Sequence, residues 1–145
     1  ESIIRVGSCG GLALDLKIGD IVVALGASTD SGMTKNLLDG FLLSPTCDYG
    51  LLISYMMTDP DAKVGGMISN DYFYQPKDWV KPVADFGILG VDMETHLLYA
   101  LSMKFGKSAL SVNTVSDHLI SGEQLTSKER ETGFNEMIRN VLESI

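Results

Sequence analysis

The sequence has few of the residues that mark metal, disulfide and nucleic-acid-binding proteins. Its 145 residues include two cysteines and two histidines, too few for a disulfide framework or a zinc cluster. Eleven lysines and arginines stand against nineteen acidic residues, for a net charge of −8. With no basic patch, this charge argues against nucleic acid as the main partner. A small anionic ligand is compatible with it, because one or two local arginines can bind phosphate whatever the total charge.

Long apolar runs are also missing. No run reaches the roughly 20 residues that a membrane-spanning helix needs. The residues after Glu1 show no basic segment ahead of an apolar stretch, as a signal peptide would require. We therefore expect a cytoplasmic protein without a membrane partner. The composition, 45% hydrophobic and 21% charged, is that of a globular protein and suits a single domain over residues 1–145.

Short apolar runs alternate with helical patterns along the chain. The runs predict strands over residues 2–6, 21–25, 63–69, 87–91 and 108–115. Helices are predicted over residues 47–58 and 92–105, and from the capping box at Thr126–Glu129 to residue 145. Residues 26–45 are rich in Gly, Ser, Thr and Asp and predict a long surface loop. This alternation predicts an α/β fold with a largely parallel sheet, in which ligands bind at the carboxyl ends of strands.

The first candidate site follows the first predicted strand, in Arg5-Val6-Gly7-Ser8-Cys9-Gly10-Gly11. Glycines after a strand let backbone N–H groups approach an anion, and Ser8 adds a hydroxyl. Arg5 could pair bidentately with a phosphate. A plain tight turn explains the pattern equally well. Because it is neither G-x-G-x-x-G nor a P-loop, it does not favour dinucleotide or ATP binding.

The second candidate site is the pair of carboxylates Asp92 and Glu94, at the start of a predicted helix. Acidic residues there often only complement the helix dipole. Glu94, however, leads into an apolar stripe, and a partly buried carboxylate needs a partner. Two sugar hydroxyls would suit it, because each carboxylate oxygen can accept one O–H.

The third candidate site is Asp117, directly after the last predicted strand. An apolar setting there could keep the carboxyl protonated, so that it acts as a general acid. An Asx turn or helix cap is the alternative. Arg130 lies in the first turn of the final helix, where a cation opposes the helix dipole, and this predicts a partner such as Asp117. His118 is expected to be structural.

Taken together, these segments resemble the bacterial, hexameric type of purine nucleoside phosphorylase in the nucleoside phosphorylase superfamily. The matching segments run in family order from end to end: IIRVGSCGG (3–11), GDIVVALGASTDS (19–31), SNDYFYQP (69–76), FGILGVDMET (86–95), FGKSAL (105–110), TVSDH (114–118) and EQLTSKERETGFNEMI (123–138). Each is weak alone. The combination, with an arginine thirteen residues after Asp117, is specific. One departure is Asp92, where the family often has Glu.

The resemblance implies a role for each matching position. It implies catalytic roles for Asp117 and Arg130, phosphate binding by Arg5 and Ser8, ribose binding by Met93 and Glu94, and base binding by Cys9, Gly10, Phe73, Val91, Asp92 and Ser116. It implies no metal and no organic cofactor, with inorganic phosphate as co-substrate. The implied reaction is reversible phosphorolysis of purine nucleosides to free base and ribose 1-phosphate, in which a protonated Asp117 donates toward N7 of the leaving base.

The resemblance also implies an architecture. The family has a three-layer α/β/α sandwich around a mixed, largely parallel sheet, and assembles as a homohexamer, a trimer of dimers. It has further strands before this segment, with a glycine-rich phosphate loop and more phosphate arginines. We therefore expect the chain to be the C-terminal majority of such a domain, truncated at its N-terminus and weakly active or inactive if it stands alone.

Three other functions remain open from the sequence. A nucleoside hydrolase of the methylthioadenosine nucleosidase kind would use water in place of phosphate, and Arg5 and Ser8 favour the phosphorylase over it. A uridine phosphorylase is a nearer relative, but Asp117 with His118 fits a purine site better. A truncated chain could also bind nucleosides without turnover.

Overall fold

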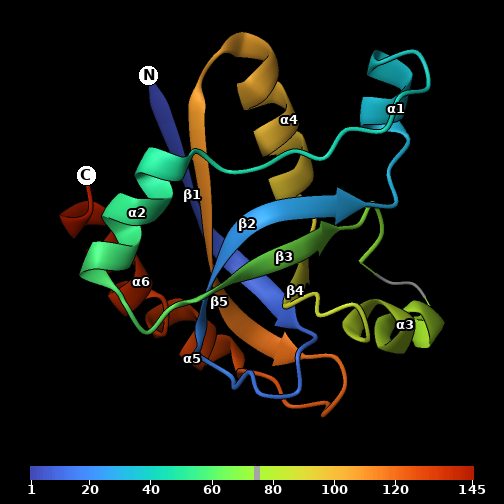
Figure 1. The fold of residues 1–145 in the computed structure, drawn as a ribbon. Coiled ribbons are helices and arrows are strands. Elements are labelled where there is room, and N and C mark those ends of the chain that lie inside the picture. Colours follow the sequence, from blue (N-terminus) through green and yellow to red (C-terminus); the bar gives the residue numbers. More distant parts are fainter. Residues whose placement is uncertain (74–75) are drawn as a thin grey trace.

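The computed structural model describes residues 1–73 and 76–145, so the motif over residues 69–76 lies partly outside the described residues. The strands are β1 (Ser2–Gly11), β2 (Ile21–Thr29), β3 (Lys63–Ser69), β4 (Gly90–Asp92) and β5 (Ser108–His118). The helices are α1 (Met33–Leu37), α2 (Tyr49–Thr58), α3 (Val80–Ala84), α4 (Thr95–Phe105), α5 (Ser127–Thr132) and α6 (Asn135–Glu143), with a 3₁₀ turn η1 (Lys77–Trp79) before α3 (Figure 1).

The strands form one mixed sheet that closes on itself in the order β1-β4-β3-β2-β5. Parallel pairing joins β1 to β5, β2 to β3 and β3 to β4, and antiparallel pairing joins β1 to β4 and β2 to β5. The predicted α/β class and the mixed, largely parallel sheet are therefore confirmed. The three-layer arrangement is not confirmed, because the described strands close into a five-stranded barrel.

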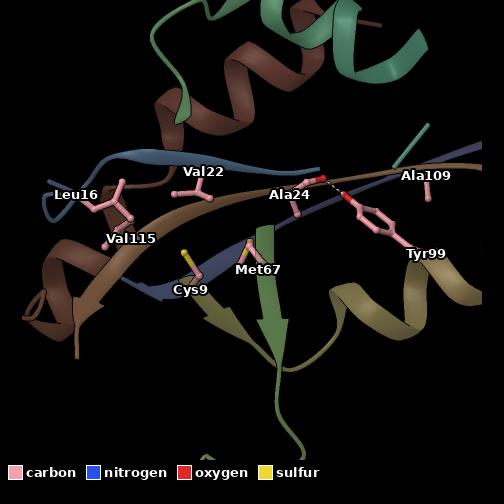
Figure 2. Packing of buried hydrophobic residues seen from close by; sticks show 8 residues of the cluster. All are labelled: Cys9, Leu16, Val22, Ala24, Met67, Tyr99, Ala109 and Val115. Carbon is pink, nitrogen blue, oxygen red and sulfur yellow. Dashed lines mark hydrogen bonds between the residues drawn. The ribbon is translucent and has the colours of Figure 1, made fainter. Parts of the chain in front are cut away.

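Two hydrophobic cores lie on opposite faces of the strands, because successive side chains of a strand point to opposite sides. One core joins α4 to the sheet through Tyr99 and contains Cys9, Leu16, Val22, Ala24, Met67, Ala109 and Val115 (Figure 2). The other packs α2 and α6 against the sheet and contains Val23, Leu52, Tyr55, Ala62, Leu110, Val112, Met137 and Val141. The alternation along β5 leaves its polar Ser111 and Asn113 on the side of α4, where the candidate site forms.

Three helix ends have well-defined caps. The Asp48 carboxylate accepts from the Leu51 N–H at 3.0 Å and caps α2, and Gly106 ends α4 with a φ of 59°. Thr126 and Glu129 form the capping box of α5. The final helix was predicted as one element, but the structure divides it into α5 and α6 at Gly133. Glycine is a poor helix former, which weakens the continuous helix at that point.

β1, β2 and β5 run further than their apolar cores predicted, β3 has the predicted bounds, and β4 covers only Gly90–Asp92 in place of the predicted residues 87–91. β1 and β5 pair from Ser2↔Ser108 to Gly11↔His118, so the glycine motif is strand and not turn. The prediction of a loop over residues 26–45 was wrong in part, because residues 26–29 continue β2 beside β3 and residues 33–37 form α1. No sequence pattern predicted η1 or α3. None of the helices in residues 1–73 and 76–145 is long and apolar enough to cross a bilayer.

Candidate active site

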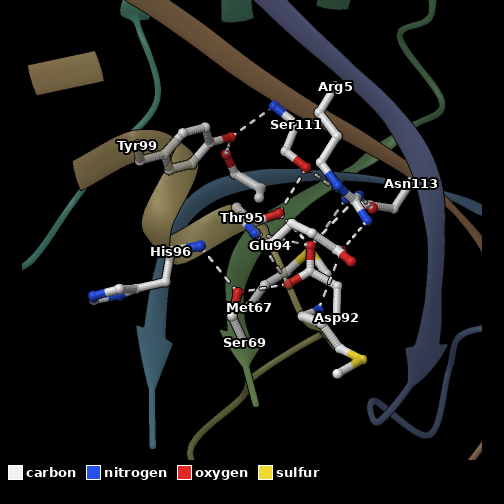
Figure 3. Close-up of polar contacts among 12 residues, drawn as sticks. Arg5, Met67, Ser69, Asp92, Glu94, Thr95, His96, Tyr99, Ser111 and Asn113 are labelled. Carbon is white, nitrogen blue, oxygen red and sulfur yellow. Dashed lines mark hydrogen bonds and ion pairs between the residues drawn. The ribbon is translucent and has the colours of Figure 1, made fainter. Parts of the chain in front are cut away.

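The candidate site is organised around the guanidinium of Arg5, which projects from β1 toward the start of α4 (Figure 3). Nη2 forms an ion pair with the Glu94 carboxylate. Nη1 donates to Asn113 Oδ1 and lies 3.4 Å from Asp92 Oδ2. The structure thus brings the first two predicted sites together, although Arg5 and Glu94 are 89 residues apart in sequence.

The two carboxylates differ sharply in their surroundings. The Asp92 side chain is 1% exposed and the Glu94 side chain is 57% exposed. Asp92 accepts from the Ser69 hydroxyl at 2.6 Å, and from both the hydroxyl and the backbone N–H of Thr95. Within the described residues, the Glu94 carboxylate has one further contact, from the backbone N–H of Met93 at 3.3 Å. Asp92 is therefore fixed within the protein, whereas Glu94 is free to exchange Arg5 for another partner.

Hydroxyl groups beneath the arginine connect the strands to α4. The Thr95 and Ser111 hydroxyls are 2.7 Å apart, and Asn113 Nδ2 donates to Ser111 Oγ at 3.1 Å. The Tyr99 hydroxyl accepts from the Ser111 N–H at 2.8 Å and donates to the Ala24 carbonyl at 2.7 Å. Burial raises the pKa of Tyr99 above its usual range. All these groups are buried and paired, so they hold the sheet and α4 in a defined relation.

His96 links α4 to the segment that carries α1. Its Nδ1 lies 2.7 Å from the Ala27 carbonyl and its Nε2 lies 2.9 Å from the Thr34 hydroxyl. Since a carbonyl only accepts, Nδ1 carries the hydrogen in this arrangement. His96, Met93 and Ser69 are among the residues that line a small pocket beside the site.

Four of the predicted base-binding residues, Cys9, Gly10, Val91 and Ser116, lie together with Asp117 at the other end of β1. Gly10 pairs with Val91 of β4 and with Asp117 of β5. A Cβ at Gly10 would lie 3.2 Å from Val91 Cγ1 and 3.3 Å from Asp117 Oδ2, and would collide with Leu119. A larger residue at position 10 would require the side chains of Leu119 and Val91 to shift. Gly10 lies five positions after Arg5 on β1, roughly 16 Å between the two Cα atoms in an extended strand, and the Arg5 guanidinium covers part of that distance because it lies over Gly7.

Asp117 is oriented by its neighbour Ser116. The Ser116 hydroxyl lies 2.8 Å from Asp117 Oδ1 and 3.4 Å from the Cys9 carbonyl. Asp117 Oδ2 instead faces Gly10. Burial raises the pKa of the Cys9 thiol to about 12, and the carboxylates of Asp92 and Asp117 add to the rise. Cys9 is therefore a neutral, buried group at neutral pH.

The remaining predicted residues lie at the surface. Ser8 is exposed on β1, Met93 is 45% exposed, and Phe73 is 67% exposed after β3. Arg130 is exposed on α5. Within residues 1–73 and 76–145 it forms no ion pair with Asp117, so the predicted pairing is absent.

His118 serves the backbone of its own loop. Its Nε2 lies 3.0 Å from the Ala13 carbonyl, and Nδ1 faces the backbone N–H groups of Ile120 and Ser121. These contacts agree with the structural role expected for it.

No sequence pattern singled out the polar residues that surround Arg5 and Asp92. They are Ser69, Thr95, Ser111 and Asn113, all buried. One signal was present, because Asn113 interrupts an apolar strand (SVNTV) and a buried amide requires partners. The other three have small hydroxyl side chains, which are common in buried strands and helix starts and carry no distinctive pattern.

Comparison with known proteins places this arrangement in a family. Residues 1–144 match the family model of the phosphorylase superfamily. Relatives include the DeoD-type purine nucleoside phosphorylases of Bacillus cereus (strain B4264) and Bacillus thuringiensis (strain Al Hakam). Each is 42% identical over 149 residues, which cover 99% of this chain and 63% of the relative. The chain thus spans about 63% of the length of these curated relatives. With a match over nearly every residue, the chain belongs to the phosphorylase superfamily.

Proposed function

We propose that this site takes part in the reversible phosphorolysis of purine nucleosides. The observation that carries the proposal is the contact between Arg5 and Glu94, from two distant segments. An arginine that binds phosphate and a carboxylate that binds sugar hydroxyls must lie side by side if phosphate is to attack C1′. The DeoD-type purine nucleoside phosphorylases that the chain resembles support this reading.

The proposed chemistry begins at Arg5. Arg5 and Ser8 hold phosphate, and Glu94 and Met93 hold the ribose. A phosphate oxygen forms the new bond to C1′ as the bond from C1′ to purine N9 breaks, which gives ribose 1-phosphate and free base. The sugar passes through an oxocarbenium-like state, which the anionic phosphate stabilises electrostatically.

The base end of the site supplies the proton. Asp117 donates from its carboxyl group to N7 as the electron pair of the broken bond moves into the purine, which is acid catalysis at a leaving group. The Ser116 hydroxyl contacts Oδ1 of Asp117, which supports Oδ2 as the proposed donor to the base. Gly10, Cys9, Val91 and Phe73 are the other residues proposed for the base pocket. The resemblance also implies a base-binding role for Asp92, but its carboxylate is buried against Arg5. Arg130 would assist only after moving toward Asp117.

Several properties of the whole enzyme belong to the same proposal. Because the chain spans 63% of its relatives' length, the activity itself and the purine nucleoside and phosphate substrates are inferred from the resemblance and the site. The absence of a metal or organic cofactor, the homohexamer and the cytoplasmic location are inferred in the same way. A three-layer sandwich is also inferred, in keeping with helices on both faces of the strands.

The test is the dependence of base release on phosphate. Inosine or adenosine is incubated with the chain at increasing phosphate, and free base and ribose 1-phosphate are both quantified. We expect release to rise with phosphate and one ribose 1-phosphate to form per base. Release at full rate without phosphate would instead identify a hydrolase. The pairing of Arg5 with Asp92 and Glu94 is compatible with that outcome, because a hydrolase does not need Arg5 to bind phosphate.

The Asp117→Asn variant tests the proton donor separately. An amide cannot transfer the proton, so kcat for 6-amino nucleosides should fall at least 100-fold, at the low end of general acid contributions. Unchanged turnover would reject that role for Asp117. Calorimetry that showed nucleoside binding but no turnover at any phosphate concentration would favour a non-catalytic binding chain.

A further inference from the structure

Asp92, Thr95, Ser111, Asn113 and Arg5 form a closed ring of polar contacts, contributed by β4, α4, β5 and β1 (Figure 3). The direction of each hydrogen bond follows from the chemistry of the groups. The Thr95 hydroxyl donates to Asp92, so the Ser111 hydroxyl donates to Thr95 and accepts from the Asn113 amide. Asn113 Oδ1 then accepts from Arg5, whose Nη1 also faces Asp92. Asn113 Nδ2 also donates to Met67 Sδ at 3.6 Å.

This ring occupies one nitrogen of the guanidinium. Nη1 donates to Asn113 Oδ1 and forms an ion pair with Asp92 Oδ2 at 3.4 Å. The remaining donors are on Nε and Nη2, along the edge that also meets the exposed Glu94. Two parallel N–H groups on one edge of an arginine match two oxygens of a phosphate. The ring therefore determines which edge of Arg5 faces the ligand.

We propose that Asp92 is a positioning residue for Arg5, acting through this buried ring to present the Nε/Nη2 edge to an oxyanion. The inference rests on the proposed function, in which Arg5 binds phosphate. Asp92 has 1% of its side chain exposed and is committed to Ser69, Thr95 and Arg5. A carboxylate enclosed in this way acts on substrate through the arginine and not by direct contact.

The Asp92→Asn variant tests the proposal, because the two side chains have nearly the same shape. An amide keeps an acceptor for Ser69 but places N–H groups against Arg5 and Thr95, which breaks the ion pair and the ring. Phosphate binding is measured by calorimetry with inorganic phosphate alone. We expect the dissociation constant to rise roughly tenfold or more, as expected for the loss of a charge-assisted contact. Nucleoside binding without phosphate should change less than threefold.

A second readout follows the arginine itself. In ¹⁵N NMR spectra, the Arg5 guanidinium of the parent chain should show slow rotation about its terminal bonds and separate Nη signals. In Asp92→Asn these signals should average. This measurement needs neither phosphate nor turnover, so it tests the positioning even if the proposed function fails. If the parent chain does not bind phosphate, the proposed function is in error at that step, while averaged signals would still support the ring.

Two further variants serve as control and rescue. Ser69→Ala removes a hydroxyl from the same carboxylate but leaves its charge and the ring intact, so phosphate affinity should stay within about twofold. The double variant Asp92→Asn with Asn113→Asp moves the charge to the opposite side of Nη1. The hydroxyls of Thr95 and Ser111 can then reverse their donation, and phosphate affinity should return to within about threefold of the parent.

Two results for Asp92→Asn would overturn the proposal. An Asp92→Asn variant that keeps phosphate affinity but loses nucleoside affinity or changes base preference would overturn the proposal and favour the base-pocket role predicted from the resemblance. Unaltered Arg5 signals would also overturn it. If Asp92→Asn does not fold, Ser111→Ala opens the ring while keeping both charges. It should then weaken phosphate binding about threefold, and no change would reject the ring as the cause.

Discussion

The contact between Arg5 and Glu94 leads to a prediction about the order of events in the site. Glu94 lies against the Nη2 of Arg5, the edge that a phosphate would use. A carboxylate and a phosphate cannot share that edge without repulsion, so phosphate must displace Glu94. The displaced carboxylate is then available to accept sugar hydroxyls. Phosphate and nucleoside should therefore bind with positive cooperativity, and Glu94→Gln should remove it.

The structure sets the size of this effect. The Glu94 side chain is 57% exposed, and exposed ion pairs contribute about 0.2–1 kcal/mol. Releasing Arg5 from that pair should lower the dissociation constant of phosphate alone by about 1.4- to 5-fold in Glu94→Gln. Nucleoside binding should change in the opposite direction. Charge-assisted hydrogen bonds contribute about 1.5–3 kcal/mol, so losing them should weaken nucleoside binding roughly 10-fold or more.

Calorimetry with each ligand alone and in the presence of the other tests the prediction. In the parent chain, saturating nucleoside should tighten phosphate binding by the same factor by which phosphate tightens nucleoside binding, since coupling is reciprocal. Added salt should reduce that factor, because the pair is exposed. Glu94→Gln should bind phosphate more tightly and show no coupling. A variant that binds phosphate more weakly than the parent would refute the reasoning.

Three other expectations concern stability and reactivity. Tyr99→Phe leaves the buried Ser111 N–H and a β2 carbonyl without the hydroxyl, and should lower the free energy of unfolding by about 2 kcal/mol in urea titrations. At pH 8 the thiol of Cys9, with a pKa of about 12, should resist labelling by a disulfide reagent until the chain unfolds. Asp48→Ala should cost about 1 kcal/mol through loss of the α2 cap. The hydrogen bond from the Leu51 N–H has the largest effect on the Asp48 carboxylate, and the bond from the Ser108 hydroxyl has the next largest. Together they hold the pKa of Asp48 below its ordinary 3.8. Its contribution should therefore be present above pH 4 and lost as the pH falls further; an unfolding curve with the same acid limb in Asp48→Ala would contradict this.

The regular elements could be predicted because each depends on local signals. The strand over residues 63–69 was placed as the structure has it, and Gly106 and the capping box mark helix ends within a few residues. The extension of β1 and β5 through Gly11 and His118 could not be predicted in the same way. It depends on pairing between strands about 105 residues apart, which supplies partners for polar and glycine residues that look like turns in isolation.

The candidate site was predictable to the extent that its residues are chemically distinctive. Arginine and carboxylates stood out in the sequence, and the structure brings Arg5, Asp92 and Glu94 together. The small hydroxyls beneath them did not stand out, because serine and threonine are tolerated in many settings. The pairing predicted between Asp117 and Arg130 is absent from the described part of the chain, so a distinctive residue type does not by itself identify its partner. A charge on a helix surface can be solvated by water as well as paired with another residue.

One arginine thus meets two carboxylates with different physical properties. Asp92 is enclosed and bonded on every side, so its charge stays beside Nη1 whether or not a ligand is present. Glu94 is largely exposed and can leave Nη2 at small cost. If both were exposed, displacing them would leave the guanidinium without orientation. If both were enclosed, no edge would remain for an anion. The combination keeps Arg5 oriented while one edge stays exchangeable, which is what a site that binds phosphate next to a sugar requires.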